Sequence, residues 1–99
     1  MKLSIITEDN AVGKDERFYH DLDLSTCGIP SNVWALQWDN TSGHIEYKGA
    51  HTQNEDITEL PAWAEAAHTL WQNAETARLA EEEAARVAAA EAAQAEGTA

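Results

Sequence analysis

The sequence has little of what stabilises disulfide-bonded, metal-binding or membrane-spanning domains. Cys27 is the one cysteine among 99 residues, which excludes an internal disulfide, suits a reducing compartment and leaves no zinc-ligand spacing. No apolar run approaches the roughly 20 residues of a membrane span. Glu8 and Asp9 follow the first apolar residues at once, so we expect neither a signal peptide nor membrane contact.

Basic side chains are also scarce. Eighteen Asp and Glu face six Lys and Arg, giving a formal charge of −12. The imbalance is eight acidic against four basic residues in 1–50 and ten against two in 51–99. Nucleic acids and anionic membranes need clustered Lys and Arg, so neither is an expected partner. The acidity is typical of a surface that suppresses self-aggregation, or of a protein that mimics DNA and binds a basic partner.

Proline and glycine are absent from residues 62–96. Ala, Glu, Gln, Arg and Leu fill most of these positions, and their helix propensity, summed along the segment, predicts one long helix over residues 61–96. We expect residues 97–99 to fray. Residues 1–60 then form a separate, aromatic and turn-rich head.

Alternating apolar residues in the head predict antiparallel strands. The strongest signal is a hairpin of residues 33–38 and 44–47 around a turn at 39–43. Alternation places Trp34, Leu36 and Trp38 on one face of the hairpin. Ile45 and Tyr47 form the matching set on the return strand.

Weaker signals complete the head. Residues 3–7 read as a first strand, and 8–10 and 13–16 as turns. Residues 21–24, with their two leucines on one face, read as a half-buried strand or an extended edge. Residues 25–32 are a predicted loop and 48–55 a surface connection, after which Asp56 or Thr58 can cap the helix. The predicted fold class is therefore α+β, with a small antiparallel sheet of three to five strands packed on the first turns of one long Ala/Glu-rich C-terminal helix.

The helix carries two apolar stripes. One has helical spacing and should pack on the head; its members are Trp63, Ala67, Leu70, Ala74 and Ala77. The other follows a heptad frame that ends at Glu91 and Gln94; its members are Ala66, Leu70, Asn73, Ala77, Ala80, Ala84 and Val87.

These stripes indicate a surface for another chain. We predict that Trp71, Leu79 and Val87 anchor a partner, while Ala77 and Ala84 permit close approach of its backbone. A homo-oligomer is one form of such packing. The alternative is a solvated, partly frayed single helix.

No residue pattern indicates catalysis or a cofactor. His20, Asp21 and Asp23 with His44 or His51 do not have the spacing of a metal site, since alternation points them in different directions. Cys27 lacks the surroundings of a nucleophile, and there is no Gly-rich phosphate loop. We expect a non-enzyme without cofactor or metal.

The aromatic residues of the head have two interpretations. They form a core, since there are few large aliphatic residues to bury, or a stacking platform for sugars or bases; the residues concerned are Trp34, Trp38, Tyr47 and Trp63.

Three segments carry a resemblance to a known family. Residues 29–39 read IPSNVWALQWD, residues 43–47 GHIEY and residues 54–63 NEDITELPAW. This series resembles small proteins encoded near the tail-fibre genes of tailed bacteriophages, over residues 1–63. Gln53 stands where the family pattern has a proline, and the Ala-rich extension is longer and plainer than usual.

The resemblance implies a virion-associated or tail-fibre-assembly role without enzymatic activity or cofactor. We therefore expect a structural component of a phage tail, made in the host bacterial cytoplasm and located in the virion, that binds a fibre or baseplate protein through its helix and aromatic face. The alternatives are an intracellular assembly chaperone that is absent from the virion, and an acidic DNA mimic that inhibits a host defence protein.

Overall fold

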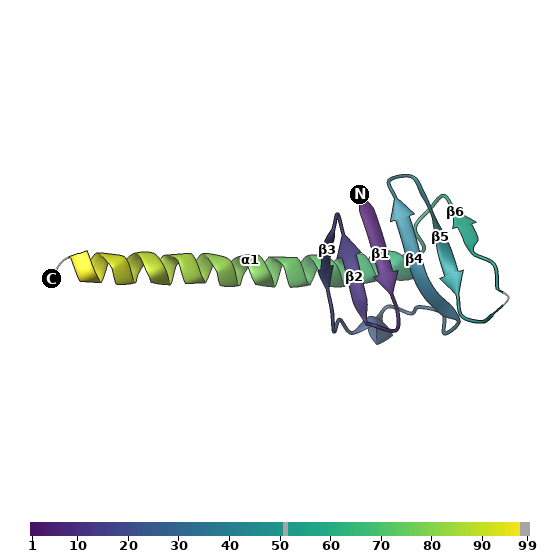
Figure 1. Cartoon of the computed structure of the whole chain (residues 1–99), viewed down its shortest axis with the longest axis horizontal. Helices are drawn as coiled ribbons and strands as arrows, with labels where there is room; N and C mark the ends of the chain where they lie inside the picture. The colour runs from purple at the N-terminus through teal and green to yellow at the C-terminus, as the bar shows by residue number, and fades with distance from the viewer. Residues whose placement is uncertain (51, 98–99) are drawn as a thin grey trace.

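A six-stranded antiparallel sheet followed by one long helix makes up the molecule, as a computed structural model shows (Figure 1). The structure describes residues 1–50 and 52–97, the last three as backbone only. The molecule measures 70 × 25 × 21 Å because the helix continues far beyond the sheet. The predicted fold class, α+β with a β-sheet head, is confirmed.

The sheet consists of two three-stranded meanders joined through their first strands. Its order is β3-β2-β1-β4-β5-β6, so β1 and β4 are central and β3 and β6 are the edges. The elements are β1 Lys2–Ile6, β2 Ala11–Lys14, β3 Arg17–Tyr19, the 3-10 helix η1 Leu24–Thr26, β4 Val33–Asp39, β5 Ser42–Tyr47, β6 Glu55–Ile57 and α1 Ala62–Gly97.

One face of the sheet is apolar and forms the core. In β1, Leu3 and Ile5 are fully buried, and Leu3 lies opposite Trp38 while Ile5 lies opposite Leu36. Val12 of β2 pairs with Ile5 and extends the same face. The period of two along each strand puts these side chains on one side, so they need a covering element.

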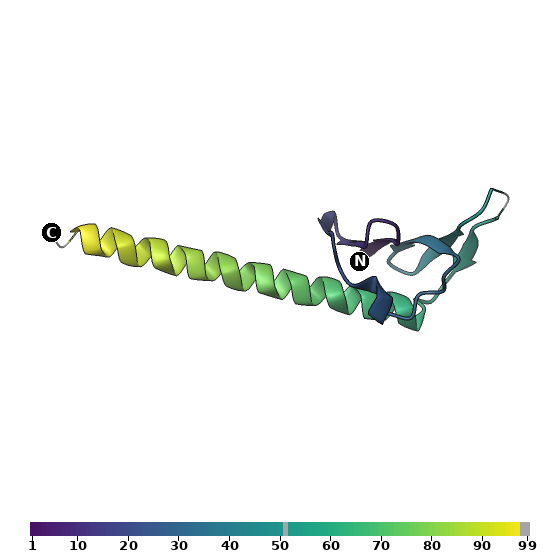
Figure 2. The ribbon, with the colours of Figure 1, turned by 90° about the horizontal axis from the view of Figure 1, so that it is seen from below.

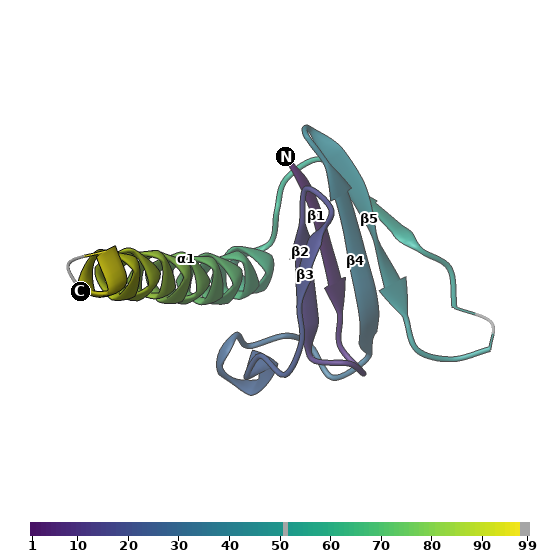
Figure 3. The same cartoon turned by 60° about the vertical axis from the view of Figure 1, so that its left-hand side comes forward.

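Helix α1 supplies that cover. Ala64 and Ala67 are fully buried and Trp71 is 9% exposed, at the i, i+3 and i+7 spacing of one helical face. The helix crosses the strands and passes the edge strand β3 (Figure 1). Among the described residues, α1 and η1 lie on the same side of the sheet, and no helix covers the opposite side (Figures 2 and 3).

The predicted hairpin is present, but one expectation about its faces is wrong. A β-bulge between Val33 and Ala35 shifts the register, so Val33 joins Leu36 on the buried face. Trp34 is instead 39% exposed. The cause is the extra residue that a bulge inserts, which a strict period of two cannot anticipate. Thr7 fixes the bulge, since its hydroxyl donates to the carbonyl oxygens of Val33 and Trp34.

The turn predicted for residues 13–16 is shorter than expected. Gly13 and Lys14 belong to β2, and only Asp15 and Glu16 form the connection to β3. Both have positive φ angles, 49° and 77°, as a two-residue turn that matches the strand twist requires. A Cβ on Gly13 would stand 2.5 Å from the Phe18 ring of β3, so a larger residue at this position would require the ring to shift.

The strand predicted for residues 21–24 is wrong. Asp21 has a φ of 59°, which ends the extended backbone, and Leu24 begins η1. Burial of Leu24 and half-burial of Leu22 explain the alternating pattern without a strand. The edge strand is β3, which the sequence analysis missed.

The segment before the helix also differs from the prediction. The end of the expected connection continues into β6, Glu55–Ile57. With the edge strands β3 and β6 the sheet has six strands, one more than the upper number expected. Asp56 and Thr58 are too far from Ala62 to cap the helix. The first turn uses the Pro61 carbonyl oxygen, which accepts bonds from the backbone of Ala64 and Glu65.

Candidate functional site

Trp71 is the main anchor of the helix on the sheet. Its indole Nε1 donates to the Arg17 carbonyl oxygen at 2.9 Å, and its ring meets Tyr19 edge to face at 5.8 Å between centroids. The Lys14 ammonium stands 5.2 Å from the ring centroid, in cation–π range. These contacts tie α1 to β2 and β3, the last two strands that it crosses.

A polar cluster follows one turn later, where the helix leaves the sheet. The Tyr19 hydroxyl donates to the Glu75 carboxylate at 2.9 Å and accepts from Arg78 Nε at 2.8 Å. Arg78 also bonds Glu75 directly, and Arg17 lies 3.3 Å from the same carboxylate. We call Arg17, Tyr19, Glu75 and Arg78 the exit cluster.

Charge pairing shifts the titration of this cluster. The Arg78 hydrogen bond is the largest effect and lowers the pKa of Glu75. Burial opposes it, while the Tyr19 hydrogen bond and the charges of Arg78 and Arg17 lower the pKa further. The hydrogen bond to Glu75 raises the pKa of Arg78. Both groups therefore stay charged at neutral pH and fix the direction in which the helix leaves the sheet.

Beyond Arg78 the helix leads away from the sheet (Figure 1), and among the described residues no hydrogen bond or ion pair joins this part to the head. All side chains of residues 79–94 are exposed, and we call this segment the rod. Leu79 and Val87, its two large apolar side chains, are 50% and 45% exposed. A projecting rod of this kind can present a surface to another chain along several turns.

Of the five residues predicted to bind a partner, four are exposed and one is buried. Leu79 and Val87 lie on the rod, and Ala77 and Ala84 are exposed as well. Trp71 instead lies in the core under the sheet, so its surface is occupied within the chain. Partner binding by the other four residues stays a prediction.

His68 is the least satisfied polar residue of the described core. Its Nε2 is buried without a hydrogen-bond partner, and its ring lies 6.4 Å from that of Trp71. Burial lowers its pKa, nearby Lys14 lowers it further, and Asp15 acts in the opposite direction. The imidazole is thus held neutral where α1 meets β2.

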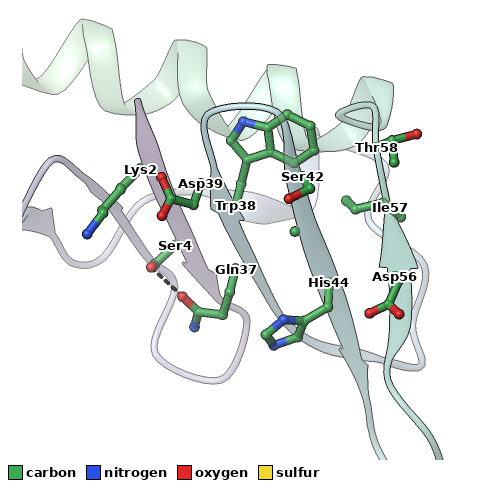
Figure 4. A pocket seen from close by; sticks show the side chains of 11 residues that line it. Lys2, Ser4, Gln37, Trp38, Asp39, Ser42, His44, Asp56, Ile57 and Thr58 are labelled. Atoms are coloured by element: carbon green, nitrogen blue, oxygen red, sulfur yellow. Dashed lines mark hydrogen bonds between the residues drawn. The ribbon is translucent and has the colours of Figure 1, made fainter.

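The opposite face of the sheet contains an open hollow of about 560 Å³ (Figure 4). One row of aligned positions crosses it, consisting of Ser4, Gln37, His44 and Asp56. The Ser4 hydroxyl donates to Gln37 Oε1 at 2.6 Å, so these two groups satisfy each other. The lining mixes polar groups with apolar surface and is open to solvent, unlike the enclosed pockets that bind most small ligands.

The described residues offer no arrangement for metal or thiol chemistry. No three His, Cys, Asp or Glu side chains among them converge as metal ligands. Of the metal cluster considered from sequence, His51 lies outside the described residues. Burial raises the pKa of the Cys27 thiol, opposite to the change that activates a cysteine nucleophile.

Comparison with known protein families, with curated proteins and with solved structures finds no match to this chain. No helix in the described part of the chain is long and apolar enough to cross a membrane. The candidate site is therefore defined by geometry alone: the rod and the exit cluster that fixes its direction.

The sequence analysis did not identify the exit cluster. Glu75 and Arg78 stand three residues apart, a spacing that indicates a pair on one helix face. Their link to Tyr19, 56 and 59 residues away in the chain, depends on where the helix crosses β3. That crossing is a tertiary feature without a local sequence signal.

Proposed function

We propose that this protein is a non-catalytic structural component of a bacteriophage tail that binds a fibre or baseplate protein through the rod. The single observation that carries the proposal is that every side chain of residues 79–94 is exposed on a helix that the sheet fixes at one end. In proteins, most of the stability of a helix comes from packing of one of its faces, so a partner surface would stabilise the rod.

The head supports this role as a rigid mount. Trp71 and the exit cluster fix the helix at its last contact with the sheet, so a partner would meet a rod whose direction is set in advance. Such preorganisation lowers the entropic cost of binding. Trp34, exposed at the bulge, supplies a second aromatic contact of the kind that anchors interfaces.

The placement in a phage tail rests on the resemblance of residues 1–63 to proteins encoded near tail-fibre genes. The proposed location is the virion tail, after synthesis in the host bacterial cytoplasm. In this proposal the protein needs no cofactor and does not bind nucleic acid or membrane.

The test is site-specific photo-crosslinking during particle production. A benzoylphenylalanine at position 87 places the probe on the rod, and the same probe at position 8 serves as a control on an exposed turn of the head. We expect the protein in purified particles, with a crosslink to a fibre or baseplate protein from position 87 only.

Other outcomes identify the alternative functions. A crosslink in the cell lysate, with the protein missing from purified particles, would indicate an assembly chaperone. Binding to a basic host protein in competition with DNA, without any crosslink to a tail protein, would indicate an acidic DNA mimic.

A further inference from the structure

One face of α1 remains uncovered both beside the head and along the rod. By 3.6 residues per turn, it lies about 140° around the helix from the face buried by the sheet. We call it the outer seam; its members are Leu70, Asn73, Ala77, Ala80, Ala84 and Val87. All but Leu70 are exposed, and Leu70 is half-buried. A second helix could therefore lie along five turns without meeting the sheet.

The charges beside the outer seam favour a basic occupant. Residues 79–94 carry four glutamates and one arginine. That arginine, Arg86, pairs with Glu83 at 2.5 Å, and Arg78 is occupied by Glu75 and Glu82. Glu81 lies beside the outer seam and Glu91 lies at its end. Among the described residues, no basic side chain forms an ion pair with either of them.

The sizes of the side chains exclude a second copy as a good occupant. In helix pairs, large residues of one helix fill the spaces between residues of the other. Ala77, Ala80 and Ala84 offer spaces, and the seam has two large apolar side chains, Leu70 and Val87, to fill them, so two copies would bury little apolar area. Each copy also carries a charge of −12, which opposes association.

We infer that the outer seam binds an amphipathic helix of another protein, with large apolar residues at its contact positions and Lys or Arg on its flanks. The inference deepens the proposed function and rests on it, since it defines the chemistry of the partner that the rod binds. Large side chains fill the spaces over the alanines, while the basic flanks meet Glu81 and Glu91.

Two synthetic peptides of 28 residues test this chemistry on the full-length protein. Both have Leu at the a and d positions of each heptad; one carries Lys and the other Glu at positions e and g. Calorimetric titration should show binding of the Lys peptide and binding of the Glu peptide at least about tenfold weaker. Sedimentation of each peptide alone corrects for its own association.

A matched pair of variants tests the position of the surface. Ala84→Glu places a carboxylate in the outer seam, and Ala89→Glu places the same charge about 140° away on the rod. Both positions are exposed and glutamate favours helix, so circular dichroism should show two folded proteins. We expect Ala84→Glu to weaken Lys-peptide binding about tenfold and Ala89→Glu to change it less than about twofold.

Three outcomes would overturn the inference. If the two variants weaken Lys-peptide binding equally, the peptide is attracted to the charge of the rod and does not bind at the outer seam. Equal binding of the two peptides would show that the seam does not prefer a basic partner. If the protein self-associates and Ala84→Glu abolishes this association, the occupant of the seam is a second copy. If position 87 still crosslinks to a tail protein in any of these cases, the proposed function stands and only this inference falls.

Discussion

The Tyr19 hydroxyl donates a hydrogen bond to the Glu75 carboxylate at 2.9 Å, and so joins the edge strand β3 to α1 at the last turn before the rod. Because the same hydroxyl accepts a bond from Arg78, one side chain of the sheet holds both partners of an ion pair on the helix. This contact decides where the head ends and the rod begins.

Removal of the Tyr19 hydroxyl should weaken this junction. Tyr19→Phe keeps the ring contact with Trp71 and removes both hydrogen bonds, so we expect a loss of about 1 kcal/mol in the free energy of unfolding. Urea unfolding followed by tryptophan fluorescence measures it. The control is Tyr47→Phe, whose hydroxyl bonds the exposed Glu55 and should contribute less. Equal losses in the two variants would contradict a special role for Tyr19.

Trp71 should be the most important helix residue for stability. Trp71→Ala leaves a cavity under the sheet and removes the indole bond to Arg17, so we expect a loss of about 3–5 kcal/mol. Leu79→Ala, on the rod, should change the free energy of unfolding by less than about 0.5 kcal/mol. Thermal unfolding monitored by near-UV circular dichroism compares the two, and a small effect of Trp71→Ala would contradict the observed core.

His68 should make stability depend on pH. Its pKa is lowered in the folded protein, so as pH falls below the ordinary value of about 6.5 the unfolded chain takes up a proton before the native state does. The free energy of unfolding should therefore decline from about pH 6.5 down to the pKa of the folded state. Urea unfolding across pH 5–8 tests this, with His68→Gln as the control. An unchanged slope in that variant would exclude His68 as the cause.

Removal of the rod should leave the head intact. A chain ending at Arg78 keeps Trp71 and the exit cluster and loses only side chains that are exposed or undescribed, so we expect little change in the unfolding midpoint of the head. The far-UV helical signal should fall in proportion to the missing residues. A destabilised or unfolded head would mean that the rod contributes to its stability, contrary to its lack of contacts.

The sequence predicted the hairpin and the helix because their signals are local. Asp39 to Gly43 separates two apolar runs, and the structure has strands on either side of Asn40 and Thr41. The helix follows from propensity summed over residues without proline or glycine. Neither prediction depends on distant parts of the chain.

The edge strands β3 and β6 could not be predicted in the same way. Each has three residues, and Arg17–Tyr19 and Glu55–Ile57 carry no clear alternation. Their backbones are extended because β2 and β5 offer free hydrogen-bonding edges. The exposure of Trp34 likewise depends on a bulge fixed by Thr7, a residue of the turn that follows β1.

By itself the sequence determined a small β head, a long acidic helix and the absence of a recognisable catalytic pattern, since composition and periodicity act locally along the chain. Only the tertiary structure decided that Trp71 lies in the core while Leu79 and Val87 stay exposed. All three residues have helical surroundings and large apolar side chains. What distinguishes them is their place relative to the sheet: Trp71 faces it, whereas Leu79 and Val87 follow the last strand that the helix crosses, and Val87 also lies on the outer seam. Burial therefore depends on the extent of the sheet and on the face of the helix, and not on the identity of the side chain.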